Sequence, residues 1–242
     1  PYSPAAGSGL SSHELNQPGA YREISDTSVI AQFKCINDNK TDKFNGMFPF
    51  YFLAWTTTPW TLPSNTALTL GAKIEYSFVK TFNQYTREKI TVVLATSLIE
   101  KVFTKNFFIV KEESKLSLFK ESDAKIPYYV VNSFKGFEFE NLRYERIWDE
   151  APLPIDNPEN AFRVILGDFV TTDDGTGIVH TAPTFGADDY KAAKSAKPEV
   201  PPLLVPDKNG NKVPLVDLKG KFIDDIGMIS GKYVKNEYYE ED

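Results

Sequence analysis

The chain has 242 residues, of which 41% are hydrophobic and 25% charged, and its net charge is −6. This length suits one large domain or two small ones, and the composition is ordinary for a globular protein. The negative charge argues against nucleic-acid binding over the whole surface, the apolar run 48–55 is too short to cross a bilayer, and a single cysteine excludes an internal disulfide and a cysteine-based zinc site.

The first third of the chain contains two strong strand patterns. We expect 1–242 to be one domain cut from a longer protein, because the chain begins at Pro1 and ends in the charged run EYYEED. Residues 1–22 are rich in Pro, Gly and Ser and are expected to be irregular, although Ser11 to Glu14 fits a capping box. Alternating polarity over 27–35 predicts a half-buried strand, and the apolar run 48–55 predicts a strand covered on both faces.

A hydroxyl-rich corner follows the second strand, with the sequence WTTTPWTLPSN at 55–65. Three consecutive threonines favour extended backbone. Pro59 removes a backbone donor and keeps Thr58 out of the helical region, so we expect a stiff corner with Trp60 close to it. The alternative is an ordinary strand end followed by a turn.

The middle of the chain predicts many short strands. A hairpin is expected from 76–80 and 90–95 around Asn83-Gln84, then a short helix over 97–103 with Ser97 as its N-cap. Further short strands are expected at 107–110, 116–119, 128–131 and 137–139, and a turn at Asn209-Gly210. Frequent turns and few helices predict a mainly β fold, a barrel-like core with peripheral helices.

The stretch 167–190, GDFVTTDDGTGIVHTAPTFGADDY, concentrates side chains that can do chemistry. It predicts a strand through Phe169 and Val170, a tight turn at 173–175, and a second strand over 176–181 that carries His180. Pro183 and Gly186 break the chain before a helix that starts near Asp189. Strand ends and helix starts on a rigid scaffold are common positions for functional side chains.

A candidate site combines this stretch with the threonine corner: Thr56, Thr57, Thr58, Trp60, His180 and Asp189. Hydroxyl groups and nearby backbone donors can hold a water and an ester carbonyl, and a neutral imidazole can hydrogen-bond a ribose hydroxyl or pass a proton. An ionised aspartate can pair with a free ammonium, and an indole can wall a small cavity. The alternatives are a structural histidine and an aspartate that compensates a helix dipole.

Two motifs, WTTTPWTLPSN at 55–65 and DGTGIVHTAPTFGADD at 174–189, carry a resemblance to a known family. The chain resembles the editing domain, called connective peptide 1, of isoleucyl-tRNA synthetase, and 1–16 looks like the start of that insertion. The resemblance covers essentially the whole chain. Thr58 separates the chain from the valyl and leucyl relatives, which carry Arg at that position and lack the Pro-Trp-Thr continuation. One small departure from the family is Thr184, where many relatives have Ala.

The resemblance implies a closed β-barrel core of the type shared by the valyl, isoleucyl and leucyl editing domains. It implies hydrolytic deacylation of valine mischarged onto isoleucine tRNA. Its catalytic residues would be Thr56, Thr57, Thr58, His180 and Asp189, and its substrate-binding residues Trp60, Gly177, Ile178 and Val179.

The resemblance also implies the surroundings of the domain. The resemblance implies no catalytic metal. It also implies no cofactor in this domain, because ATP is used by the synthetic domain, whose HIGH-type and KMSKS-type signatures are absent from this chain. The expected partners are the acceptor end of tRNA(Ile) carrying valine and the rest of the synthetase, in the cytoplasm and away from membranes.

Two other functions are weighed against this one. A binding module could grip the tRNA acceptor end without cleaving the ester, and a deacylation assay would separate the two. An aspartic-protease-like barrel needs Asp-Thr/Ser-Gly, whereas the order here is Asp174-Gly175-Thr176.

Overall fold

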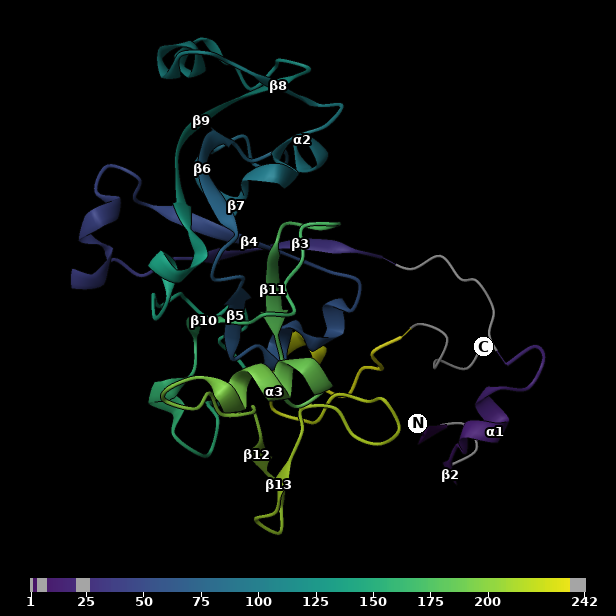
Figure 1. The fold of residues 1–242 in the computed structure, drawn as a ribbon. Helices are drawn as coiled ribbons and strands as arrows, with labels where there is room; N and C mark the ends of the chain where they lie inside the picture. Colours follow the sequence, from purple (N-terminus) through teal and green to yellow (C-terminus); the bar gives the residue numbers. More distant parts are fainter. Residues whose placement is uncertain (1, 4–7, 21–26, 236–242) are drawn as a thin grey trace.

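The computed structural model describes residues 2–3, 8–20 and 27–235 (Figure 1). The strands are β1 (Tyr2–Ser3), β2 (Ser8–Gly9), β3 (Val29–Lys34), β4 (Phe50–Thr56), β5 (Ala67–Leu70), β6 (Glu75–Phe82), β7 (Lys89–Ala95), β8 (Phe107–Ile109), β9 (Ile126–Lys135), β10 (Arg163–Leu166), β11 (Ile178–Thr181), β12 (Val205–Pro206) and β13 (Lys212–Val213). The α-helices are α1 (Ser12–Leu15), α2 (Ile99–Val102) and α3 (Ala187–Ser195). The 3-10 helices are η1 (Asn39–Phe44), η2 (Pro59–Ser64), η3 (Thr96–Leu98), η4 (Glu113–Leu118), η5 (Gly136–Phe139), η6 (Pro158–Asn160) and η7 (Gly227–Ile229).

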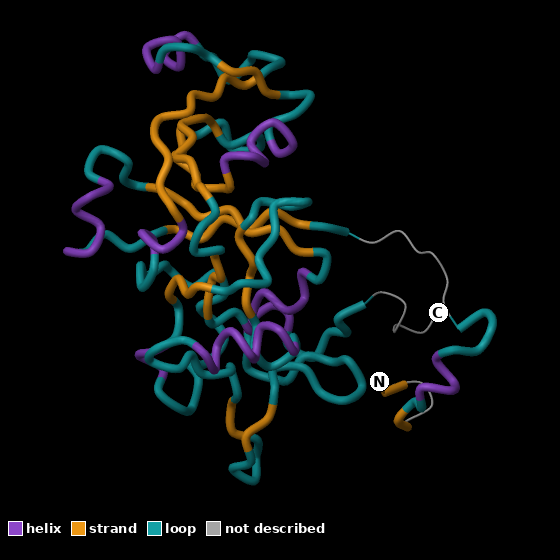
Figure 2. The backbone as a smooth tube through the Cα atoms, in the orientation of Figure 1, coloured by secondary structure: helices purple, strands orange, loops and turns teal. Residues whose placement is uncertain are grey.

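Nine of the strands form one mixed sheet in the order β10-β5-β11-β4-β7-β6-β9-β8, with β3 paired to β4. β11 pairs in parallel with β4 and antiparallel with β5, so it lies between them. Figure 2 shows the helical segments at the periphery of these strands. The predicted strand-rich core with peripheral helices is therefore confirmed as a sheet-dominated mixed fold.

The segment 142–145 connects β3 to β10 by backbone pairing. Cys35 bridges Tyr144, and Arg143 bridges Arg163, both antiparallel. The amide of Glu145 donates to the carbonyl of Lys34 at 2.8 Å, next to the first of these bridges. Backbone pairing thus continues from β3 through this segment to β10.

An aromatic core fills the space beneath the sheet. The alternating pattern predicted for 27–35 places Ala31 and Phe33 of β3 inside, and β4 buries Phe50 and Phe52 completely. Phe44 of η1 stacks on the ring of Phe139 at 5.0 Å. Each fully buried side chain of this size contributes about 1.5–3 kcal/mol, so this cluster gives the strands a rigid base.

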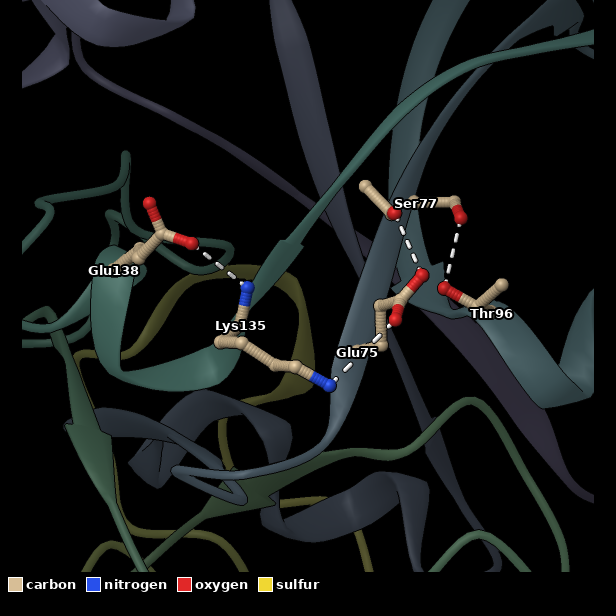
Figure 3. A network of polar contacts seen from close by, with 6 residues as sticks. Glu75, Ser77, Thr96, Lys135 and Glu138 are labelled. Atoms are coloured by element: carbon tan, nitrogen blue, oxygen red, sulfur yellow. Dashed lines mark hydrogen bonds and ion pairs between the residues drawn. The ribbon is translucent and has the colours of Figure 1, made fainter.

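Polar contacts mark the irregular part of the β6–β9 ladder (Figure 3). Ser133 donates to Glu75 at 2.6 Å, and Lys135 lies 3.5 Å from the same carboxylate. The hydroxyl groups of Ser77 and Thr96 are 2.8 Å apart, and the register of the two strands shifts just after Ser77. The ion pair is exposed to solvent and contributes little to stability; these contacts lie on one side of the bulge.

The hairpin predicted within 167–190 is wrong. Phe169 and Val170 lie outside the strands, and β11 starts only at Ile178. Both edges of β11 are occupied, one by β4 and the other by β5, so a hairpin partner has no free edge to join. The helix predicted at the end of this stretch is confirmed as α3.

Some of the other predicted strands and helices are confirmed by the structure, and others are wrong. The strands predicted at 27–35 and 48–55 are confirmed as β3 and β4, and the predicted hairpin as β6–β7. The strands predicted at 116–119 and 137–139 are wrong, because these residues belong to or follow the 3-10 helices η4 and η5. Ser97 is not an N-cap; it lies inside η3. Short apolar runs fit either structure, so packing decides between them.

The ends of the described chain add small elements. The predicted capping box is present, since Ser11 and Glu14 cap the single turn of α1 in both directions. β12 and β13 form a short hairpin whose turn contains Gly210 with a φ of 81°. In the part of the chain described here, no helix is both long enough and apolar enough to cross a membrane.

Candidate functional site

The sheet brings five of the predicted site residues to one pocket. β4 and β11 run in parallel with Val179 opposite Trp55, so their carboxyl ends lie at the same edge of the sheet. η2 follows β4 there, and α3 follows β11 after a short loop (Figure 1). The pocket has a volume of about 300 Å³. It is lined by Thr56, Thr58, Trp60, Thr61, His180, Ala182, Phe185, Gly186 and Asp189.

The threonine corner is held by its own hydrogen bonds. The Thr56 hydroxyl accepts from the amide of Thr58 at 3.0 Å, which turns the chain away from the strand. Pro59 then starts η2, where a missing amide donor is tolerated. Thr56 and Thr58 are half-buried at the pocket, whereas Thr57 is exposed and does not line it. The role of Thr57 stays a prediction.

His180 has hydrogen-bond partners at both ring nitrogens. Its Nε2 lies 3.0 Å from the Thr61 hydroxyl, and its Nδ1 lies 2.8 Å from Nδ2 of Asn65. The side chain is only 6% exposed. Burial lowers the pKa of His180 from 6.5 to about 4, so the imidazole is neutral at physiological pH.

These contacts fix which nitrogen carries the proton. The amide of Asn65 also donates to the carbonyl of Ala67 at 2.8 Å, so its nitrogen, not its oxygen, faces both Ala67 and His180. Nδ1 of His180 therefore accepts, and Nε2 carries the proton. That proton points to the Thr61 hydroxyl, which donates in turn to the carbonyl of Thr58 at 2.8 Å.

Asp189 is anchored in the first turn of α3. Its Oδ2 accepts from the amide of Ala182 at 2.9 Å. Burial raises the pKa of Asp189, while the hydrogen bond from Ala182 acts in the opposite direction. Asp188 turns to solvent instead, where its Oδ1 lies 3.1 Å from Nζ of Lys191. The two neighbouring carboxylates thus occupy different environments, and only Asp189 lines the pocket.

Gly186 leaves room for the Asp189 carboxylate. A Cβ atom at Gly186 would lie 2.7 Å from Oδ2 and 2.8 Å from Cγ of Asp189. The backbone φ of Gly186 is −103°, which any residue can adopt. Glycine is therefore favoured here by the close approach of the Asp189 side chain and not by backbone conformation.

An aromatic wall closes one side of the pocket. The rings of Trp60 and Phe185 meet edge to face, 5.0 Å apart. Both rings pack on the buried cluster that contains Leu203 and Leu215. This backing gives the wall a fixed position.

The other three predicted substrate residues lie elsewhere. Gly177, Ile178 and Val179 line a second hollow of about 240 Å³ beside the ring of Trp55. The carbonyl of Gly177 accepts from the hydroxyl of Tyr76 at 2.7 Å. The structure does not bring these three residues to the pocket of His180, and their role in substrate binding stays a prediction.

Sequence reasoning missed five residues of the site. Thr61 and Asn65 lie inside the first motif, in and directly after η2, and their polar character next to the threonine corner was a signal for them. Ala182, Phe185 and Gly186 lie inside the second motif, between His180 and the helix. Among the described residues, no group of three or more His, Cys, Asp or Glu side chains is placed to hold a metal ion.

Comparison of the sequence with known proteins finds relatives among the isoleucine–tRNA ligases. No family model matches it. It is 49% identical over 241 residues to an isoleucine–tRNA ligase of Cytophaga hutchinsonii, covering 98% of this chain and 20% of the relative. It is 50% identical over 255 residues to an isoleucine–tRNA ligase of Bacteroides fragilis, covering 98% of this chain and 21% of the relative.

Solved structures give a weaker likeness. The editing domain of the cytosolic leucyl-tRNA synthetase of P. knowlesi matches with a TM-score of 0.47 and 13% identity, covering 67% of this chain and 60% of that one. The corresponding domain of P. falciparum matches with a TM-score of 0.40 and 13% identity, covering 65% and 53%.

The sequence matches extend over nearly all of this chain but only part of each relative. The chain spans about a fifth of the length of the ligases in Cytophaga hutchinsonii and Bacteroides fragilis. Identity near one half over such a span is far above the level at which homology is in doubt. The chain is therefore homologous, along nearly its whole length, to one segment of the isoleucine–tRNA ligases.

Proposed function

We propose that the pocket of His180 hydrolyses aminoacyl esters and removes valine from mischarged tRNA(Ile). The observation that carries the proposal is the position of Asp189, a half-buried carboxylate facing the threonine corner across one pocket. An ester of a free amino acid has an ammonium group beside its carbonyl. A carboxylate at one side and hydroxyl groups at the other match that pair of groups.

The proposed reaction adds water across the ester bond. The water oxygen bonds to the carbonyl carbon, the bond from that carbon to the ribose oxygen breaks, and the ribose oxygen takes a proton. Asp189 pairs with the ammonium, and the corner at Thr56 and Thr58 orients the carbonyl and the water. His180 is neutral with both nitrogens engaged, so it serves as a fixed wall beside the ribose and not as a free base.

Size selection follows from the wall. A pocket that accepts isoleucine discriminates against valine by only about 1–3 kcal/mol, because the two differ by one methylene. Isoleucyl-tRNA synthetase is itself the standard example of this limit, and the magnitude is known from that enzyme. A second pocket that admits valine and rejects isoleucine supplies the missing selectivity, and Trp60, Phe185 and His180 are the rigid surfaces that would do so.

The proposal extends to the fold and the surroundings. We infer that the strands close into a barrel, which the backbone bridges from β3 through 142–145 to β10 support. The partners would be the acceptor end of tRNA(Ile) carrying valine and the rest of a cytoplasmic synthetase, whose other domains use ATP. The alternative, a module that binds the acceptor end without cleaving, gives the same partners and no hydrolysis.

A deacylation assay separates these possibilities. The chain is mixed in excess with valyl-tRNA(Ile) and, separately, with isoleucyl-tRNA(Ile), and single-turnover rates are measured. We expect rapid loss of valine, slow loss of isoleucine, and a sharply reduced rate for His180→Ala with an unchanged circular dichroism spectrum. Binding without cleavage would favour the alternative module, and equal rates for both esters would contradict size selection.

A further inference from the structure

Tyr144 lies beneath the site without lining the pocket. Its ring is 1% exposed and packs edge to face on Phe33, 5.3 Å away. Its hydroxyl donates to Oδ1 of Asn65 at 2.6 Å. Tyr144 comes from the segment 142–145 that joins β3 to β10, far in sequence from both motifs.

A directional chain of hydrogen bonds leads from this hydroxyl to the threonine corner. Asn65 accepts from Tyr144 with its oxygen and donates to His180 with its nitrogen, at 2.6 and 2.8 Å. His180 donates to Thr61, as its tautomer requires, and Thr61 donates to the carbonyl of Thr58. Tyr144 is the first member of this chain, and Asn65 donates from the same nitrogen to the carbonyl of Ala67 as well.

The Asn65 amide is the vulnerable link. Asn65 is only 4% exposed, so water does not replace a lost partner. Without the Tyr144 hydroxyl, Oδ1 of Asn65 would be buried with no donor, which is unfavourable enough to drive the amide to a new position. Any rotation toward another donor weakens the bond from Nδ2 to His180, because the same planar amide carries both atoms.

We propose that Tyr144 is a positioning residue for the hydrolytic site: it holds Asn65, and through Asn65 it fixes the tautomer and orientation of His180. The assignment rests on the proposed function for its effect on rate, but its effect on the imidazole can be observed independently. Tyr144 touches no reacting atom, so it acts only through its neighbours. The segment 142–145 would then serve the sheet and the site together.

The test uses Tyr144→Phe, which keeps the ring and its packing on Phe33. Tyr76→Phe is the matched control, because Tyr76 is 0% exposed and its hydroxyl is bonded only to backbone groups, of Gly71 and Gly177. The chain has only two histidines, so nitrogen-15 NMR of labelled imidazoles resolves His180 directly. The same proteins are assayed for single-turnover deacylation of valyl-tRNA(Ile).

In the native chain and in Tyr76→Phe we expect the Nε2-protonated tautomer of His180. In Tyr144→Phe we expect a mixture of tautomers and a deacylation rate reduced roughly tenfold, the effect of one lost buried hydrogen bond. An unchanged tautomer in Tyr144→Phe would overturn the assignment, as would a changed tautomer with a native rate. If the native chain fails to deacylate, the proposed function fails, and the NMR comparison still decides whether Tyr144 orders His180.

Discussion

The buried imidazole of His180 makes the stability of the chain depend on pH. Burial lowers its pKa from 6.5 to about 4, and at 1.36 kcal/mol per pKa unit this difference corresponds to about 3 kcal/mol. As the pH falls below 6.5, the unfolded chain takes up a proton that the folded chain refuses until about pH 4. The free energy of unfolding should therefore be highest above pH 6.5 and fall through this window, by about 2 kcal/mol between pH 7.5 and pH 5.

The assay is urea unfolding followed by tryptophan fluorescence at several values of pH in this range. His180→Gln is the reference, because glutamine cannot titrate and the remaining groups are common to both proteins. Asp189 contributes with the opposite sign, since its raised pKa lets the folded chain gain a proton as the pH falls. That contribution is present in both proteins, so the difference between their slopes isolates His180. Equal slopes in the two proteins would refute the neutral, buried state of the imidazole.

Three further predictions concern the reaction. Asp189→Asn and Asp189→Ala should deacylate valyl-tRNA(Ile) about 10- to 100-fold more slowly, as for a lost charge-assisted hydrogen bond, whereas Asp188→Asn should have a small effect. With N-acetylated valyl-tRNA(Ile), the native chain should lose most of its rate advantage over the Asp189 variants. A large loss of rate in Asp188→Asn would contradict the assignment. Gly186→Ala should lower the rate by displacing the Asp189 carboxylate while the melting temperature changes little, since its φ suits alanine; a native rate would show that the carboxylate has room to move. Activity should survive EDTA, because one cysteine and two histidines are too few for a standard zinc site; loss of activity that added metal restores would refute this.

Residue patterns predicted the parts of the fold that are determined locally. Alternation identified β3, the continuous apolar run identified β4, and the chain break at Pro183 and Gly186 before Asp189 identified the start of α3. The two motifs also indicated Thr56, Thr58, Trp60, His180 and Asp189, which the parallel pairing of β4 with β11 brings to one pocket. That pairing follows from the fold and was not evident in the spacing of the motifs.

Interactions distant in sequence could not be predicted in this way. The hairpin expected at 167–181 fits every local rule, yet β4 and β5 occupy both edges of β11. Tyr144 lies in a stretch with no functional signal, and only its hydrogen bond to Asn65, 79 residues away in sequence, connects it to the site. In the sequence Gly186 looks like a simple chain break. Its role next to Asp189 could not be predicted, because the sequence does not show that the Asp189 side chain folds back over the start of its own helix.

The insertion of β11 between β4 and β5 has a consequence for synthesis of the chain. β5 ends at Leu70 and β11 begins at Ile178, so more than a hundred residues are made after β5 before its partner exists. At roughly 5–20 residues per second, this interval lasts about 5–20 seconds on the ribosome. During that time the facing edges of β4 and β5 have unpaired amides and carbonyls, the template that favours aggregation. Unpaired edges at this seam therefore persist until β11 has been synthesised, and this interval is the one in which a chaperone would protect the nascent chain.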